Sequence, residues 1–235
     1  RLNESFNHWI VYHTPFVTVK AAMTLDGKIA TASGESKWIT GEGSRAFGMK
    51  LRQGADAILV GINTILADDS ALTIRGSKVG VQGSRRRIIL DSMARTPLNA
   101  KVVSDEFANL TTVIVSKAAP KKRIAVLAKR ANVIVAPTMK INLPWLLKKL
   151  GAENITNLLV EGGGEVNAAF LLGGLAQRVA FFYAPKILGG RDARKAVAGD
   201  GVKKLSDAIQ LGDIEWKRIG KDLLLTALVA SKGKK

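Results

Sequence analysis

The chain has 235 residues, of which 47% are hydrophobic, and a formal net charge of +17. This length suits one large α/β domain or, as the weaker alternative, two small ones, and the hydrophobic share is enough for a core, which argues against global disorder. The sequence has no run of about 18 apolar residues, so we predict no membrane span. Cysteine is absent, which excludes disulfides, thiolate catalysis and Cys-based zinc sites and fits a reducing, cytoplasmic setting.

Many of the 36 basic residues fall in separate clusters, among them Arg85-Arg86-Arg87 and Lys121-Lys122-Arg123. With only two Tyr, the chain lacks the aromatic residues that stack bases in a strand-binding groove. We therefore interpret the clusters as solvated surface. Steering of a phosphorylated substrate is the second interpretation, and nucleic-acid binding is the weakest. His8 and His13 precede the first strand and are expected to be surface or linker residues, so we predict no metal site.

The N-terminal part reads as alternating strands and helices after an arm at residues 1–14. Phe16 to Met23 alternates and is rich in β-formers, which predicts a strand that ends before the Asp26-Gly27 turn. Thr40 is the expected N-cap of a helix that runs to about Gln53. The remaining elements are a buried strand at 57–62, a short helical turn, an acidic loop at 67–70 and a mobile surface loop at 76–86.

The C-terminal part continues the alternation and then changes to a hairpin. We predict strands at 88–90, 112–115, 132–136, 158–160 and 178–188 and helices at 121–131, 144–150 and 165–172. Residues 214–219 and 223–229 flank Gly220 as an antiparallel hairpin. The fold class is therefore α/β, with a mixed, mainly parallel sheet flanked by helices. We expect one domain at 15–230 and a disordered basic tail at 231–235.

The most informative segment is the glycine turn, Glu161-Gly162-Gly163-Gly164, between a predicted strand and a predicted helix. Free N–H groups and a positive dipole at a helix N-terminus bind phosphate, and glycine lets a ligand approach the backbone. The Rossmann pattern fails because Asn167 stands at its sixth position, and no Walker lysine follows. A tight turn with close packing is the alternative interpretation.

A second group of polar residues follows the first strand. Lys20 stands between apolar neighbours on that strand and needs a charged partner or a place at its end. In open α/β sheets, ligands gather beyond the carboxyl ends of the strands, where we place Asp26, Glu35, Ser36, Trp38 and Thr40. Arginine captures phosphate in a bidentate manner. Further charges come from Arg52, Asp68 and Arg75.

Six motifs, which follow one another along the chain, carry a resemblance to a known family. The resemblance covers the chain from Pro15 to Val229. The motifs are Thr24-Leu25-Asp26-Gly27-Lys28-Ile29-Ala30, Gly34-Glu35-Ser36-x-Trp38-Ile39-Thr40, Gly61-x-Asn63-Thr64 with Ala67-Asp68-Asp69, Leu72-Thr73-x-Arg75, Glu161-Gly162-Gly163 and Ala184-Pro185-Lys186-x-Leu188-Gly189-Gly190. The chain resembles the reductase domain of the bifunctional riboflavin-biosynthesis deaminase/reductase. The opening Arg-Leu-Asn-Glu also looks like the junction that follows the family's deaminase domain.

The resemblance implies a dihydrofolate-reductase-like fold. It also implies reduction by NADPH of the ribosyl group of 5-amino-6-(5-phosphoribosylamino)uracil to a ribityl chain. The implied nucleotide contacts are Ala22, Trp38, Thr64, Asp68, Ser92, Gly163, Gly164, Glu165, Val166, Asn167, Ala168 and Ala169. The implied substrate contacts are Ser36, Arg52, Leu72, Arg75 and Glu161. The family tends to associate, so we expect a homo-oligomer.

For the chemistry, we expect the ribosylamine to open to an imine that accepts hydride at C1′. Opening needs a proton relay, for which we name Lys20, Asp68 and Glu161 as catalytic candidates. Ser92 is expected to bind the 2′-phosphate of NADPH, with Arg95 nearby. The family's zinc deaminase needs cysteines, so deamination is excluded here. The alternatives are the related reductase that acts before deamination on the diaminopyrimidine substrate, dihydrofolate reductase, and a basic nucleic-acid-binding module.

Overall fold

The structure, a computed structural model, describes residues 3–74 and 85–230. The chain divides into two compact units, each made from two segments. Unit 1 comprises Arg1–Phe16 and Leu51–Leu159, and unit 2 comprises Val17–Lys50 and Val160–Lys235.

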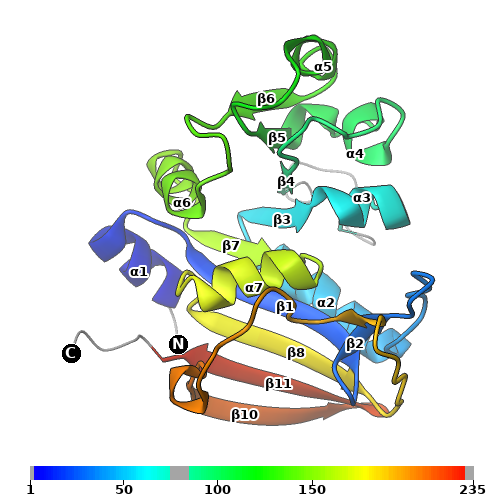
Figure 1. The fold of residues 1–235 in the computed structure, drawn as a ribbon. Coiled ribbons are helices and arrows are strands. Elements are labelled where there is room, and N and C mark those ends of the chain that lie inside the picture. Colours follow the sequence, from blue (N-terminus) through cyan, green and yellow to red (C-terminus); the bar gives the residue numbers. More distant parts are fainter. Residues whose placement is uncertain (1–2, 75–84, 231–235) are drawn as a thin grey trace. The chain divides into compact units, whose positions relative to one another are not determined.

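Unit 1 contains parallel strands, four of which follow one another in sequence order (Figure 1). The strands β3 (Ala57–Gly61), β4 (Arg86–Leu90), β5 (Thr111–Val115) and β6 (Asn132–Val135) pair in parallel. β7 (Asn157–Val160) lies next to β3. Every residue of β3 and of β5 is buried, as expected for parallel strands covered on both faces.

The helices of unit 1 cover this sheet. α3 (Ile62–Asp68), α4 (Lys101–Ser104) and α5 (Lys121–Leu127) contribute Ile65, Val103 and Leu127 to one apolar cluster with Ile58 and Ile89 of the strands. α6 (Leu143–Ala152) buries its own leucines, and the 3₁₀ turn η1 (Ala108–Leu110) precedes β5. The predicted basic helix at 121–131 is therefore observed but ends at Leu127.

The N-terminal segment is a helix where the sequence suggested an arm. α1 (Glu4–Tyr12) is tied to α6 because Trp9 Nε1 donates a hydrogen bond of 2.8 Å to the Gly151 carbonyl. A Cβ at Gly151 would lie 2.1 Å from the His13 carbonyl oxygen, so glycine is needed for this close approach. His8 is half-buried, lies 3.2 Å from Thr14 Oγ1, and has its pKa lowered by burial.

One cation of the Arg85-Arg86-Arg87 cluster is buried, so the interpretation of that cluster as solvated surface is wrong for Arg87. This side chain is 1% exposed, and all five of its N–H groups donate hydrogen bonds. Two of them form a bidentate pair with Asp105, at 2.6 and 2.8 Å. The others go to Thr111 Oγ1 and to the carbonyls of Ala71 and Val102. Arg87 therefore joins three parts of unit 1.

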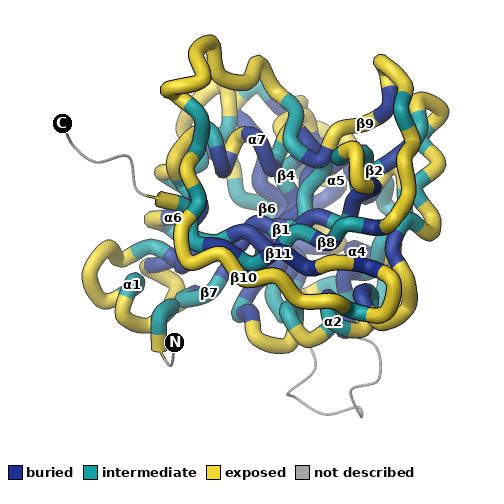
Figure 2. The backbone as a smooth tube through the Cα atoms, turned by 90° about the horizontal axis from the view of Figure 1, so that it is seen from below, coloured by how far each residue is buried: buried dark blue, intermediate teal, exposed yellow. Residues whose placement is uncertain are grey.

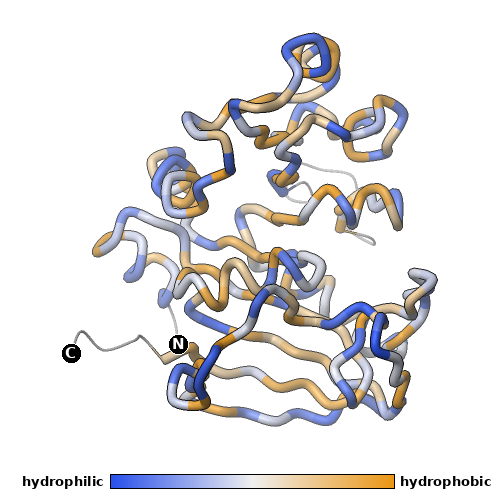
Figure 3. The backbone as a smooth tube through the Cα atoms, viewed as in Figure 1, coloured by the Kyte–Doolittle hydropathy of each residue, from blue (hydrophilic) through white to orange (hydrophobic). Residues whose placement is uncertain are grey.

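Unit 2 contains four strands in the order β10-β11-β8-β1. β1 (Phe16–Thr24) pairs in parallel with β8 (Arg178–Ala184), and β8 pairs antiparallel with β11 (Asp222–Val229). β10 (Leu211–Ile219) completes the antiparallel hairpin. Figure 2 shows β1, β8 and β11 as mostly buried and β10 as exposed, and Figure 3 shows the hydrophobic residues along β8 and β11. The predicted mixed, mainly parallel sheet with a C-terminal hairpin is confirmed.

Two smaller features complete unit 2. β2 (Lys28–Ala30) pairs antiparallel with β9 (Arg194–Lys195) as a separate two-stranded sheet, and η2 (Leu205–Asp207) precedes the hairpin. α2 (Glu42–Gln53) begins slightly after the predicted Thr40 cap. Buried Asp222 of β11 accepts hydrogen bonds from Gly41 N–H and Ser44 Oγ there. A carboxylate at this end suits the helix dipole.

Some predicted boundaries were wrong. β8 ends at Ala184 rather than at residue 188, because Pro185 has no N–H to continue the ladder. Residues 76–84 of the predicted surface loop and residues 231–235 of the predicted tail lie outside the described residues, while Arg86 belongs to β4. Within residues 3–74 and 85–230, the structure contains no helix that is long and apolar enough to cross a membrane.

We predict that Asp105→Asn lowers the free energy of unfolding by about 3 kcal/mol, because it leaves the buried Arg87 guanidinium without its anion. Chemical denaturation measures this loss. Glu106→Gln is the matched control, since Glu106 is the exposed neighbour and should change stability little. Equal stabilities of the two variants would contradict the role given to the Arg87–Asp105 pair.

Candidate active site

The predicted site residues divide between the units. Unit 2 carries Lys20, Ala22, Ser36, Trp38, Glu161 and the run from Gly163 to Ala169, whereas unit 1 carries Arg52, Thr64, Asp68, Leu72 and Ser92. Arg75 lies outside the described residues.

Lys20 and Glu161 form an ion pair in unit 2. Lys20 Nζ lies 3.9 Å from Glu161 Oε2, and the two side chains are 20% and 10% exposed. The same ammonium lies 5.8 Å from the centre of the Phe182 ring. A Cβ at Gly48 of α2 would lie 3.8 Å from Lys20 Cε, so a residue larger than alanine there would displace the lysine. The pair is thus a partly buried cation and anion that can exchange a proton with a ligand.

The glycine turn following Glu161 serves both packing and access. A Cβ at Gly162 would lie 2.5 Å from Val166 Cβ, and one at Gly164 would lie 2.2 Å from the Lys195 carbonyl oxygen. These two glycines are explained by close packing. Gly163, which precedes α7 (Gly164–Leu172), differs because a Cβ there would meet no described atom within 4 Å. Close packing therefore explains Gly162 and Gly164, whereas Gly163 leaves room for a phosphate to approach the backbone.

The first turn of α7 can bind an anion. Helix geometry leaves the N–H groups of Gly164, Glu165 and Val166 without intrahelical partners, whereas Asn167 N–H donates to the Gly163 carbonyl. Asn167 is fully buried: its Nδ2 donates to the Ala196 carbonyl at 2.8 Å, and its Oδ1 accepts no hydrogen bond from the described part of the chain. A donor on a ligand would satisfy that oxygen.

Not every residue of this run can contact a ligand through its side chain. Ala168 is buried at 2% exposure, whereas Ala169 is exposed. In unit 1, Leu72 is 3% exposed and belongs to the apolar core, with φ of 55°. Any contact that Leu72 makes with substrate must therefore use its backbone.

Trp38 lies in the loop between β2 and α2 and is held by two cations. The Arg45 guanidinium lies 4.7 Å from the centre of the Trp38 ring, and Lys186 Nζ donates to the Trp38 carbonyl at 2.8 Å. The ring is still 60% exposed, so it presents an aromatic surface of fixed position. Ser36, in the same loop, is half-buried between exposed Glu35 and Lys37.

In unit 1, three of the predicted residues lie at or after the carboxyl ends of β3 and β4. Thr64 and Asp68 are half-buried on α3, which directly follows β3, and Ser92 is exposed after β4. Arg52 lies on α2, and its Nη1 donates to the Thr73 carbonyl at 3.1 Å. The structure therefore brings Arg52 close to the Leu72–Thr73 segment.

The loop after β4 includes a residue that sequence reasoning missed. Asp91 is fully buried; its Oδ2 accepts hydrogen bonds from the N–H and Oγ1 of Thr96, and its Oδ1 lies 3.9 Å from Arg95 Nε. Arg95 Nη2 donates to Asn63 Oδ1 at 3.2 Å. Because Arg95 remains half exposed, its guanidinium is oriented but still accessible to an anion. The sequence signal that could have identified Asp91 is its place as a carboxylate directly after a buried strand.

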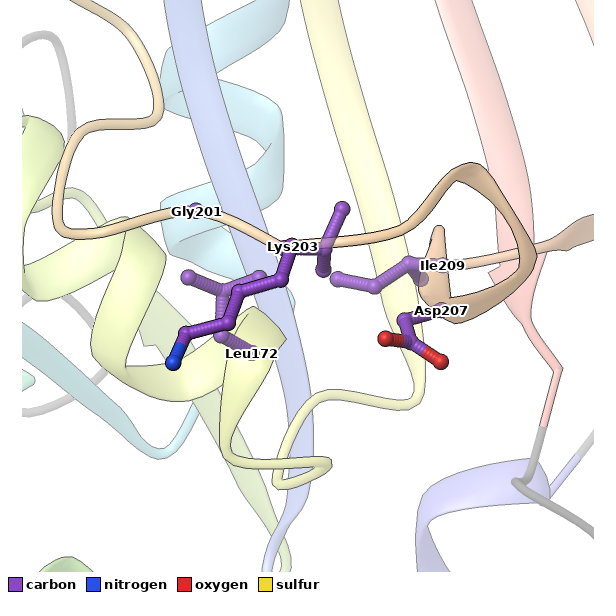
Figure 4. Close-up of a pocket in the computed structure, with 6 residues that line it drawn as sticks. Leu172, Gly201, Lys203, Asp207 and Ile209 are labelled. Carbon is purple, nitrogen blue, oxygen red and sulfur yellow. The ribbon is translucent and has the colours of Figure 1, made fainter.

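The cavity in Figure 4 is separate from these residues. It has a volume of about 280 Å³ and is lined by Leu172, at the C-terminal end of α7, and by Gly201, Val202, Lys203, Asp207 and Ile209. None of the predicted site residues within the described ranges lines it. Residues 3–74 and 85–230 also contain no group of three His, Asp or Glu side chains that could hold a metal ion.

Comparison with known proteins supplies the family. The profile of the RibD C-terminal domain matches residues 15–225 and so extends over both units. The 2,5-diamino-6-ribosylamino-4(3H)-pyrimidinone 5′-phosphate reductase of Methanothermobacter thermautotrophicus is 46% identical over 214 residues, which cover 90% of this chain and 96% of that protein. The riboflavin biosynthesis protein RibD of Actinobacillus pleuropneumoniae is 38% identical over 98% of this chain.

Solved structures agree with this assignment. The RibD structure from Acinetobacter baumannii superposes with a TM-score of 0.83 and 28% identity, covering 97% of this chain and 62% of that one. This chain likewise spans 61% of the Actinobacillus RibD protein, so the activities of the full-length RibD proteins are not assigned to this chain. The dihydrofolate-reductase-like fold class expected from the sequence is confirmed. The chain belongs to the RibD C-terminal domain family, the reductases of riboflavin biosynthesis.

Proposed function

We propose that this chain uses NADPH to reduce the ribosyl group of a ribosylaminopyrimidine 5′-phosphate to a ribityl chain. The observation that carries the proposal is the Lys20–Glu161 pair, at 3.9 Å, directly before the glycine turn of α7. Because Glu161 directly precedes the glycine turn, a proton-exchanging pair lies next to an anion-binding helix N-terminus. Membership of a reductase family supports the same chemistry.

The substrate has two candidate forms, which differ in the pyrimidine ring rather than in the sugar. The sequence resemblance implied the uracil form, and the Thermotoga maritima protein named as a deaminase and 5-amino-6-(5-phosphoribosylamino)uracil reductase superposes with a TM-score of 0.75 and 27% identity. The diaminopyrimidinone form is the second candidate. It is favoured by the 46% identity to the Methanothermobacter reductase, which is named for that substrate.

The residues of the glycine turn fit a dinucleotide. The space at Gly163 lets a pyrophosphate approach the N–H groups of Gly164, Glu165 and Val166, and the helix dipole favours its charge. Asn167 Oδ1 offers an acceptor to a donor group of the cofactor. The exposed Trp38 ring and the residues Ala22, Thr64 and Asp68 are the other proposed contacts. Bound NADPH supplies the hydride.

The preference for NADPH over NADH is assigned to the loop after β4. The exposed Ser92 hydroxyl donates a hydrogen bond to a phosphate oxygen, and the Arg95 guanidinium supplies the charge. Arg95 is oriented by Asn63 and by the buried carboxylate of Asp91. A guanidinium held in this way loses little side-chain freedom on binding an anion.

The proton chemistry is assigned to Lys20 and Glu161. In ring opening, the C1′–O4′ bond breaks and C1′ becomes doubly bonded to nitrogen. One proton leaves that nitrogen and one is added to O4′, so the step needs a base and an acid but no net proton. A carboxylate and an ammonium 3.9 Å apart provide both. Hydride addition at C1′ then requires one proton at nitrogen, which the protonated Glu161 returns. Lys20, left neutral after protonating O4′, takes up one proton from solvent to restore the pair. Asp68 remains a further candidate for this relay.

The 5′-phosphate of the substrate is assigned to arginine. Arg52 and Arg75 are the proposed partners, with Ser36 and the backbone of Leu72 as polar contacts. Arg52 already donates to the carbonyl of Thr73, next to Leu72, which fixes the direction of its guanidinium. Charge-assisted, bidentate bonds of this type are stronger than neutral ones.

The deciding experiment follows the absorbance of NADPH with each of the two purified substrates. We expect NADPH to be oxidised with at least one of the two substrates. The preferred substrate should have a higher kcat/KM than the other, and NADH should give a much lower rate than NADPH. A salt series measures polyanion binding in parallel, because nucleic-acid affinity falls steeply with salt. Absence of turnover with both forms, together with tight and salt-sensitive RNA binding, would replace the enzyme by the nucleic-acid-binding alternative.

We predict that Glu161→Gln lowers kcat about 100-fold or more, the usual contribution of a general acid or base. Lys20→Met should cause a similar loss. The double variant should lose little more than either single variant, because the two groups act as a unit. Glu215→Gln, on the exposed strand β10, is the control. Retained kcat in Glu161→Gln would remove this carboxylate from the mechanism.

We predict opposite effects for two substitutions in the glycine turn. Gly164→Ala should lower the melting temperature, because its Cβ would lie 2.2 Å from the Lys195 carbonyl oxygen. Gly163→Ser should retain or raise the melting temperature, since serine is a good N-cap. Its hydroxyl would occupy the N–H groups of α7 and so raise the Kd of NADPH. Unchanged NADPH affinity in Gly163→Ser would contradict the pyrophosphate assignment.

A further inference from the structure

Two motifs of the sequence have no part in the chemistry above, namely the Asp26 turn and the segment that begins at Pro185. The structure joins them. Residues 185–198, which we call the strap, leave the end of β8 and include β9, which lies beside β2 (Figure 2). The strap contacts four separate parts of unit 2.

Asp26 anchors the strap near its beginning. Asp26 Oδ1 accepts hydrogen bonds from Thr24 Oγ1 at 2.7 Å and Leu188 N–H at 3.0 Å, and Oδ2 accepts one from Gly189 N–H at 2.8 Å. Leu25 N–H also donates to the Lys186 carbonyl at 2.8 Å. These bonds, the one from Thr24 above all, lower the pKa of Asp26 to about 2. The carboxylate therefore stays ionised, and both of its oxygens are used.

Just before this anchor, the strap fixes the loop that carries Trp38. Lys186 Nζ donates to the Trp38 carbonyl at 2.8 Å. Lys186 is itself exposed, so the direction of its side chain depends on the backbone that Asp26 holds. The exposed face of the Trp38 ring then has a defined position, because Arg45 lies against the ring.

Beyond the anchor, the strap fixes the N-terminus of α7. Ala196 N–H donates to the Gly27 carbonyl at 2.9 Å, one residue after Asp26. The Ala196 carbonyl accepts from Asn167 Nδ2 at 2.8 Å, and Ala198 N–H donates to the Gly164 carbonyl at 3.1 Å. The same segment thus contacts the glycine turn and the Trp38 loop.

We propose that Asp26 and Lys186 are positioning residues for the cofactor. Through the strap they hold the Trp38 loop and the α7 N-terminus at the separation that NADPH requires. The inference rests on the proposed function, because it takes both of these elements to be cofactor contacts. Neither Asp26 nor Lys186 touches the reacting atoms in this account, so their loss affects binding of NADPH more than the rate of the bound complex.

The test compares the Kd of NADPH, from its fluorescence, with kcat and KM in matched variants. Lys186→Met and Asp26→Asn should each raise the Kd about tenfold, equal to about 1.4 kcal/mol, with kcat close to that of the wild type. The double variant should be little weaker than either single variant, since both act through the strap. Lys186→Arg, which keeps a donor for the Trp38 carbonyl, should restore most of the affinity.

Two controls separate this effect from general changes of charge or stability. Asp192→Asn lies on the strap at an exposed position, and Lys221→Met lies in the exposed turn of the β10–β11 hairpin. Both should bind NADPH as the wild type does. Lys186 is exposed, so Lys186→Met should fold even where Asp26→Asn lowers the melting temperature.

The outcomes are distinct. Wild-type affinity for NADPH in Lys186→Met, or independent and multiplicative effects in the double variant, would overturn the positioning role while the reductase assignment stands. A wild-type chain that binds no NADPH overturns both proposals. Higher Kd values in both single variants, with kcat retained and rescue by arginine, support the strap as the positioning element.

Discussion

An ammonium group in the middle of a buried strand is the constraint on which unit 2 depends. Lys20 lies between Val19 and Ala21, both almost completely buried, and a charge there is costly without compensation. Two neighbours provide it: Glu161 as the anion and the Phe182 ring as a cation–π partner. The carboxylate that makes the lysine tolerable in the fold also completes a proton-exchanging pair.

Much of the fold could be predicted because the signals were local. The apolar run at 57–62 and the hairpin around Gly220 appear as β3 and β10–β11, since buried strands and tight turns have compositions of their own. The glycine turn was also located correctly between a strand and a helix. The roles of its individual glycines could not be predicted. Only the structure shows that packing requires glycine at 162 and 164, whereas a Cβ at Gly163 would meet no described atom within 4 Å.

The features that sequence reasoning missed depend on partners far away in the chain. Arg87 looked like a surface charge because nothing near it in sequence indicates that Asp105 and the carbonyls of Ala71 and Val102 surround it. Likewise, α1 was expected to be an arm, and the hydrogen bond that ties it to α6 joins Trp9 to Gly151, 142 positions apart. Asp222 accepts from Ser44 over 178 positions. Local secondary-structure propensity carries no information about such contacts.

The construction of unit 2 from two distant segments also bears on how the chain folds. The β3–β4–β5–β6 strands of unit 1 pair in sequence order within one continuous segment, so each can add to the strand before it as the chain grows. By contrast, Gln177 N–H donates to the Val17 carbonyl at 2.9 Å and so continues the pairing of β1 with β8, and these two residues are 160 positions apart. Pairing over such a separation forms slowly because loop closure precedes any gain. During synthesis, the apolar residues of β1 therefore stay exposed until β8 has been made, and exposed apolar strands of this kind are prone to aggregation.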